Sequence, residues 1–152
     1  MNPRYAQVAE RATHRCEYCR APEAIFNLPF EVEHIVPPGR GGVDHESNWA
    51  LSCRACNLHK SDHLEAMDPQ SRAVVPLFHP RRHRWEEHFS VEQSTGALLG
   101  LTAIGRATIG RLQMNRPTQL AARRQWMRRT QRRWSGGRSP CRMGHVLALR
   151  WR

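Results

Sequence analysis

Two Cys-x-x-Cys pairs constrain this chain more than any other feature of its sequence. Cys16 and Cys19 form the first pair, and Cys53 and Cys56 form the second. Four thiolates at this spacing are typical of a structural zinc site, in which two turns each supply two ligands to a tetrahedral ion. Disulfides are the alternative. We expect reduced cysteines because residues 1–5 lead into a polar segment with no apolar leader, and because reducing compartments, here the cytoplasm, favour metal sites.

The net charge of +11 is distributed unevenly along the chain. Residues 93–152 contain thirteen Arg and no Asp or Glu, whereas residues 1–92 hold eleven basic and thirteen acidic residues. A basic segment of this kind attracts polyanions, most often nucleic acid, although a solvated helix face is the alternative. No apolar run approaches the ~20 residues of a membrane helix. We therefore expect a soluble protein without a membrane partner, and its oligomeric state stays open.

The segment between the cysteine pairs predicts two strands followed by a helix. Apolar Phe30, Val32 and Ile35 suggest a strand over residues 29–35, and the prolines and glycines of residues 37–42 require a loop. Residues 47–52 then predict a second strand and residues 54–64 a helix. With a short helix over residues 5–13, this ββα unit forms a predicted domain over residues 1–65.

The rest of the chain predicts an extension and a tail. Residues 66–129 should contain a strand at 74–78, a hairpin formed by 85–91 and 97–101, and a helix capped by Thr102. A last helix should begin at Pro117 and reach at least Arg133, past the end of this extension. Residues 130–152 are expected to be a basic, disordered tail. The overall prediction is an α+β protein.

The residues between the cysteines suit cleavage of a phosphodiester, which needs a base for the attacking water and a cation near the leaving oxygen. His34 is the natural base because imidazole titrates near neutrality. Glu33 could bind a hard divalent cation, and the amide of Asn57 could complete its shell, with His59 as an alternative ligand. Neighbouring side chains on a strand face opposite ways, so Glu33 and His34 can share one site only if the backbone bends.

Four further residues have predicted supporting roles. Asn48 should hold the loop by hydrogen bonds to its backbone, and Arg40, Arg54 and Lys60 should contact phosphates. Less specific roles remain open for three residues: His34 as a packed core histidine, Asn48 as a turn former, and Asn57 as a helix cap.

This pattern resembles the HNH endonuclease family. The resemblance lies in Glu33-His34-Ile35, the Gly41-Gly42 loop, Asn48, and the run from Cys53 to Lys60 with its upstream cysteines. It implies a ββα-metal fold, cleavage or nicking of DNA, one catalytic Mg²⁺ or Mn²⁺, and a separate structural Zn²⁺.

The resemblance also assigns roles to individual residues. The general base falls on His34, the strand carboxylate ligand on Glu33, the middle asparagine on Asn48 and the last ligand on Asn57. Many members have aspartate in place of Glu33 and histidine in place of Asn57. A zinc-stabilised nucleic-acid-binding module without catalysis is the alternative function.

Overall fold

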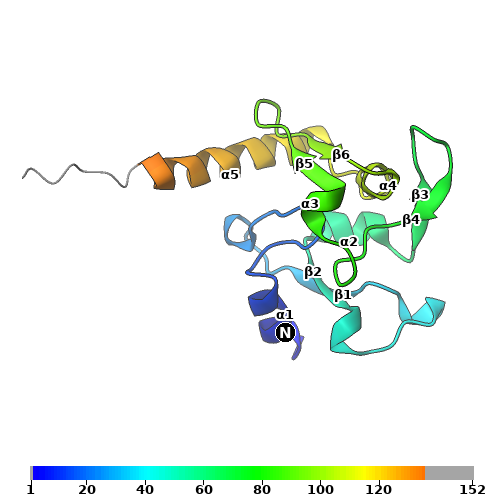
Figure 1. Ribbon diagram of the computed structural model, residues 1–152. Coiled ribbons are helices and arrows are strands. Elements are labelled where there is room, and N and C mark those ends of the chain that lie inside the picture. Colours follow the sequence, from blue (N-terminus) through cyan, green and yellow to red (C-terminus); the bar gives the residue numbers. More distant parts are fainter. Residues whose placement is uncertain (1, 136–152) are drawn as a thin grey trace, which may run out of the picture.

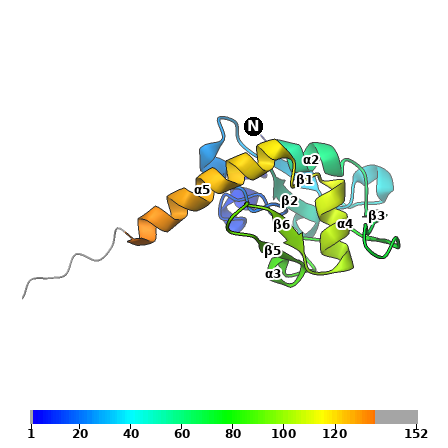
Figure 2. The same cartoon turned by 90° about the horizontal axis from the view of Figure 1, so that it is seen from above.

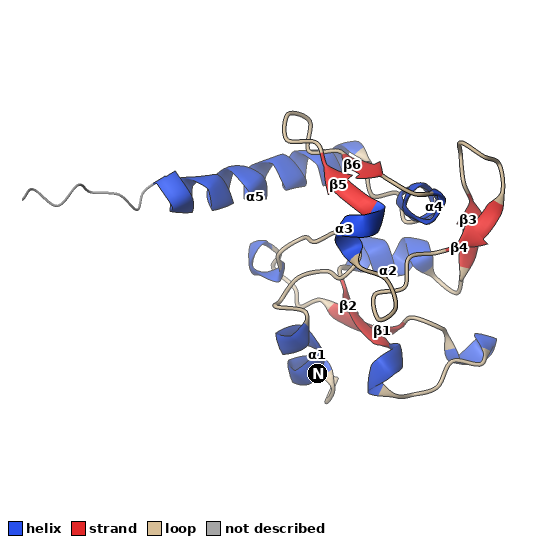
Figure 3. Ribbon diagram, viewed as in Figure 1, coloured by secondary structure: helices blue, strands red, loops and turns tan. Residues whose placement is uncertain are grey.

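The computed structural model describes residues 2–135, with side chains as far as residue 128. The elements are helices and short strands, in keeping with the predicted α+β class (Figures 1 and 3). In chain order they are α1 (Tyr5–Arg11), η1 (Glu23–Ile25), β1 (Glu31–His34), η2 (Pro38–Arg40), η3 (Glu46–Asn48), β2 (Trp49–Ser52), α2 (Arg54–Lys60), β3 (Glu65–Met67), β4 (Val74–Pro76), α3 (Trp85–His88), β5 (Phe89–Val91), β6 (Leu98–Gly100), α4 (Ala103–Arg111) and α5 (Pro117–Ser135).

The first hairpin organises the segment between the cysteines. Strands β1 and β2 pair antiparallel, with Glu31 opposite Ser52 and His34 opposite Trp49. Helix α1 packs against both strands, and α2 packs against β1. The described elements follow the order β1, loop, β2 and α2, which is consistent with the predicted α+β fold. Both strands are shorter than predicted, and the turn of η3 occupies the start of the expected second strand.

The extension adds two more antiparallel hairpins, β3–β4 and β5–β6. Helix α4 packs against β3, β4 and β6 and so joins the two hairpins. Of the predicted hairpin between residues 85–91 and 97–101, only residues 89–91 pair, and they pair with residues 98–100. Residues 85–88 instead form the short helix α3, whose first turn carries Glu86 and Glu87, where carboxylates interact favourably with a helix N-terminus.

Both C-terminal helices begin as predicted. The hydroxyl of Thr102 accepts a hydrogen bond from the amide of Gly105 at 3.1 Å, and Pro117 occupies the first position of α5, where its missing N–H costs nothing. Helix α5 continues to Ser135 and projects away from the rest of the fold (Figures 1 and 2). Residues 130–135, expected in a disordered tail, are thus helical, and residues 136–152 lie outside the described residues.

One apolar core joins the two predicted domains. The ring of Phe78 lies 6.5 Å from that of Tyr18 and 5.1 Å from that of Phe89. The indole N–H of Trp85 donates to the backbone oxygen of Tyr18 at 2.8 Å. Residues 66–129 therefore pack directly on the cysteine-bearing segment. Among the described helices, none combines the length and apolar character that a membrane span requires.

Candidate metal centre and nuclease site

Four buried cysteines meet at one point. The sulfur atoms of Cys16, Cys19, Cys53 and Cys56 all lie within 4.8 Å of one another, and those of Cys19 and Cys53 are 3.8 Å apart. Zinc–sulfur bonds of about 2.3 Å in a tetrahedron place two sulfurs about 3.8 Å apart. The cluster therefore fits a zinc-type metal site with a closed coordination shell.

Backbone contacts hold the two cysteine turns in register. In the first turn, the amide of Glu17 donates to the oxygen of Leu51 at 2.9 Å, and the Glu17 carboxylate accepts from the amide of Leu51 at 2.8 Å. The second turn begins α2, with Cys53 as its N-cap residue. Because Leu51 lies in β2, two residues before Cys53, these bonds fix both cysteine turns to the same strand.

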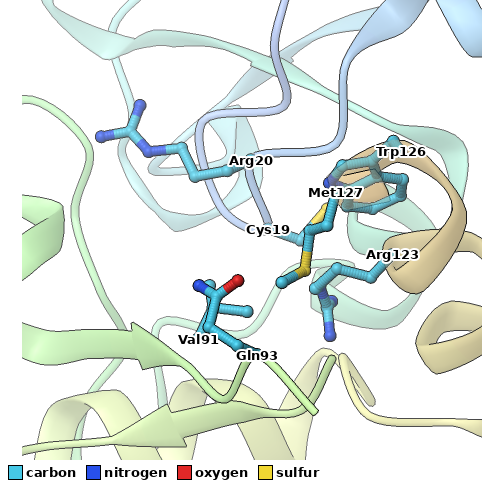
Figure 4. Close-up of a pocket in the computed structure, with 7 residues that line it drawn as sticks. All are labelled: Cys19, Arg20, Val91, Gln93, Arg123, Trp126 and Met127. Carbon is cyan, nitrogen blue, oxygen red and sulfur yellow. The ribbon is translucent and has the colours of Figure 1, made fainter. Parts of the chain in front are cut away.

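Helix α5 covers the cysteine cluster from the side of the extension. A small cavity of about 170 Å³ lies beside Cys19, and Arg123, Trp126 and Met127 line it (Figure 4). Arg123 is 1% exposed. Burial lowers its pKa, and the thiols oppose that effect. Its guanidinium donates to the oxygens of Gly96 and Met114 at 2.7 and 3.0 Å. A positive charge is thus buried close to a site that would carry several thiolates.

His34 stands at the end of β1 with its side chain partly exposed. Its Nε2 lies 2.9 Å from an oxygen of Asp44, and the indole N–H of Trp49 donates to the same oxygen at 3.0 Å. Arg4 forms an ion pair with the other oxygen of Asp44. The His34 contact, followed by weaker effects of Trp49 and Arg4, lowers the pKa of Asp44. Since a carboxylate accepts hydrogen bonds, Nε2 carries the proton and Nδ1 holds the lone pair.

Asn48 holds the loop after His34, as its predicted role requires. Its amide oxygen accepts from the amide of Val36 at 2.8 Å, and its NH₂ group donates to the oxygens of Val36 and Val43 at 2.8 and 2.9 Å. Gly42 is needed for this close approach, because a Cβ there would lie 1.7 Å from the oxygen of Val36. The bonds of Asn48 therefore fix both ends of the loop that carries Asp44.

Glu33 does not point toward His34. Strand alternation directs it to the opposite face, where it is buried and accepts a hydrogen bond from the hydroxyl of Tyr18. Its other oxygen pairs with Lys60 at 3.0 Å. Burial raises the pKa of Glu33, and Lys60 opposes this effect. Both oxygens of the predicted metal ligand are thus engaged within the protein.

Lys60 is placed differently from the prediction that it contacts a phosphate. It is 2% exposed, and besides Glu33 it donates to the backbone oxygen of His34 at 3.2 Å. An ammonium enclosed in this way cannot reach the backbone of a nucleic acid. The sequence around Lys60 did not indicate that this side chain is buried, because its ion-pair partner, Glu33, lies in β1 and not in α2.

The predicted ligands of the catalytic ion are not brought together. Asn57 donates through its NH₂ group to Glu31, which also accepts from Arg54 at 2.7 Å. The alternative ligand His59 contacts Arg116 at 3.2 Å. Within the described part of the chain, the cysteines are the one group of three or more His, Cys, Asp or Glu ligands that could share an ion. The described residues do not fit the predicted shell of Glu33 and Asn57.

Two predicted phosphate contacts remain accessible. Arg54 has 79% of its side chain exposed, although it pairs with Glu31. Arg40 is 56% exposed and lies 3.9 Å from Asp62. Both lie close in sequence to the predicted catalytic residues. Asp44, the direct partner of His34, was not predicted from the sequence, although a carboxylate in the glycine-containing loop after a candidate base was a usable signal.

The candidate site thus combines a histidine at the end of β1 that contacts a carboxylate, a loop held by Asn48, and a helix that begins at the second cysteine turn. Residues 16–63 match the family model described as HNH endonuclease, in agreement with the resemblance, and the name HNH domain is used for these residues. Residues 64–152 lie beyond the matched region. The comparison with curated proteins found no match, and neither did the comparison with solved structures.

Proposed function

We propose that the protein is an endonuclease that hydrolyses DNA phosphodiester bonds with His34 as the general base. The observation that carries the proposal is the contact between Nε2 of His34 and the carboxylate of Asp44. Asp44 orients the ring and stabilises the positive charge that the ring gains when it takes a proton. Nδ1 is then the atom that accepts a proton from the attacking water.

The rest of the site positions this base. Asn48 accepts a hydrogen bond from the amide of Val36, two residues after His34. Lys60 donates a hydrogen bond to the backbone oxygen of His34 itself. The proposal includes Zn²⁺ at the four cysteines as a structural ion. It also includes dependence on Mg²⁺ or Mn²⁺, which in such hydrolysis stabilises charge on the leaving oxygen. Because Glu33 is paired with Lys60, no ligand set for that second ion is assigned.

A plasmid-nicking assay tests the proposal. Zinc-loaded protein should convert supercoiled DNA to open circles in Mg²⁺ or Mn²⁺, and His34→Ala should lower the rate by about 10²–10⁴-fold, the usual contribution of a general base. His14→Ala is the matched control, because His14 is 61% exposed and pairs with Glu23, away from Asp44. Equal rates for the wild type and His34→Ala would refute the proposal.

The ion pair between Glu33 and Lys60 favours a second candidate function, a nucleic-acid-binding module without catalysis. An HNH domain whose strand carboxylate is neutralised inside the protein has lost one ligand of the family's catalytic ion. This alternative predicts DNA binding that weakens steeply with salt, no nicking with any divalent ion, and no effect of His34→Ala on binding.

A further inference from the structure

A pocket of about 400 Å³ lies between the HNH domain and the extension. One side is lined by Val36, Gly42 and Val43. These residues belong to the loop of residues 36–43 that Asn48 holds, here called the pinned loop. On the other side the pocket is lined by the turn that precedes α3, through His79, Arg81 and Arg82. The pocket thus combines the matched segment with residues that lie outside it.

The pocket has the charge expected of an anion site. Every ionisable residue in its lining is an arginine or a histidine. Arg82 is exposed, and none of the described carboxylates forms an ion pair with it. Arg81 pairs with Glu17, yet its Nε is buried and has no hydrogen-bond partner. Burial lowers the pKa of Arg81 to about 10, so it stays charged at neutral pH.

Both walls of the pocket are held in place before any ligand binds. The amides of Arg82 and His83 donate to the oxygen of His79 at 3.0 Å, and the amide of Arg81 donates to Nδ1 of His79 at 3.2 Å. The opposite wall is fixed by the bonds of Asn48 to Val36 and Val43. A preorganised cationic site loses less entropy on binding.

The pocket shares its loop with the candidate base. Val36 follows His34 by two residues, and Val43 immediately precedes Asp44. A phosphate held in the pocket would therefore lie against the loop that joins His34 to Asp44. Arginine is well suited to this role because its guanidinium can bind two phosphate oxygens at once.

We propose that the pocket formed by the pinned loop and residues His79, Arg81 and Arg82 binds a backbone phosphate of the DNA that is presented to His34. This inference rests on the proposed function for the identity of the substrate. It assigns the extension a direct part in holding DNA, with Arg82 as the accessible phosphate contact.

Binding without divalent ions tests the pocket separately from hydrolysis. Fluorescence anisotropy would follow a labelled DNA duplex over a series of NaCl concentrations with the full-length, zinc-loaded chain. Arg82→Ala should raise the Kd several-fold and reduce the slope of log K against log salt by about one. Arg84→Ala is the matched control, because Arg84 is 80% exposed, belongs to the same turn and pairs with Glu87, but does not line the pocket.

The results separate the two proposals. Weaker binding by Arg82→Ala than by Arg84→Ala supports the pocket even if the wild type never nicks DNA. Equal effects of the two variants, or no DNA binding by the wild type, would overturn the pocket proposal. Thermal midpoints of both variants would verify that folding is unchanged. Nicking by the wild type together with equal binding effects would leave only the endonuclease proposal standing.

Discussion

At the scale of single residues, Asp44 determines how His34 can act. The carboxylate fixes the proton on Nε2 and leaves Nδ1 free. Asp44→Asn should keep the fold, because Asp44 is exposed, but it should remove the negative charge that stabilises protonated His34. We expect the nicking rate to fall about 10-fold or more, with a smaller loss than for His34→Ala. Asp62→Asn, which removes another exposed carboxylate, is the control, and an equal rate for the two variants would contradict the assigned role.

The buried pair of Glu33 and Lys60 makes a prediction about stability. Removal of one partner leaves an uncompensated buried charge, which costs about 3–5 kcal/mol. Lys60→Met should therefore lower the free energy of unfolding in urea by roughly that amount. Arg54→Met provides the comparison, since the Arg54–Glu31 pair lies near the surface and should contribute at most about 1 kcal/mol.

The double variant Glu33→Leu with Lys60→Met extends this test. Replacement of both partners by apolar groups should restore much of the stability lost in Lys60→Met, because a buried ion pair and an apolar pair are often of similar stability. If Lys60→Met and Arg54→Met cost the same, the burial of the pair would be refuted.

The residues of the site were predictable where their chemistry is local. Cys16, Cys19, Cys53 and Cys56 follow from spacing alone, and the loop-pinning bonds of Asn48 follow from its position. The partners of Glu33 were not predictable, because they depend on which face of β1 its side chain occupies and on contacts with Tyr18 and Lys60 across the fold. A sequence read residue by residue does not contain those pairings.

At the scale of elements, one carboxylate ties the β3–β4 turn to α4. Asp68 is buried and accepts two hydrogen bonds from Arg106, both at 2.8 Å, and one from the hydroxyl of Ser71 at 2.7 Å. Arg106, and then Ser71, hold the pKa of Asp68 well below its usual range. Its stabilising effect is therefore present above the unfolded-state pKa of about 4 and is lost as the pH falls toward the lower folded-state pKa.

Asp68→Asn should consequently be less stable than the wild type near pH 7, and the difference should shrink as the pH falls below about 4. Urea unfolding of both proteins across this range measures the difference. Asp62→Asn gives the size of a general charge effect, because Asp62 is 63% exposed. A difference between wild type and Asp68→Asn that grows in acid would contradict the assigned ion pair.

Elements with strong terminal signals were predicted well, and short strands were not. Thr102 and Pro117 mark the starts of α4 and α5, because a cap residue or a first-turn proline acts locally. Strand β3 was missed, since residues 65–67 have no alternating pattern of their own and are held by pairing with β4. Helix α3 was read as extended for the corresponding reason, that its four residues are too few for a helical period.

At the scale of the whole molecule, the cysteine cluster should control folding. Purified protein should contain about one zinc ion per chain by mass spectrometry, because the described cysteines supply one tetrahedral set. Cys53→Ser should lose the ion and lower the thermal midpoint strongly, since metal-binding free energy here contributes to folding. Cys141→Ser is the control for loss of a thiol, because Cys141 belongs to neither Cys-x-x-Cys pair. A metal-free Cys53→Ser protein as stable as the wild type would refute the metal site.

The predicted boundary between residues 65 and 66 does not separate two independent cores. Residues 66–129 share a core with the HNH domain through Phe78, Trp85 and Tyr18. Such contacts between distant segments depend on three-dimensional closure, and composition or spacing does not reveal them. The basic charge of the C-terminal part was visible in the sequence, whereas the pocket between Arg82 and the pinned loop required the fold.

The hydrogen bond from Trp85 to Tyr18 should make the fluorescence of Trp85 sensitive to the state of the metal site. The acceptor is a backbone oxygen between two metal-binding cysteines, and the indole is almost fully buried. Release of the ion should loosen that turn, break this bond and admit water, and the emission spectrum of the indole should shift in response. The chain would then carry its own indicator of zinc loading, readable during a chelator titration without any added dye.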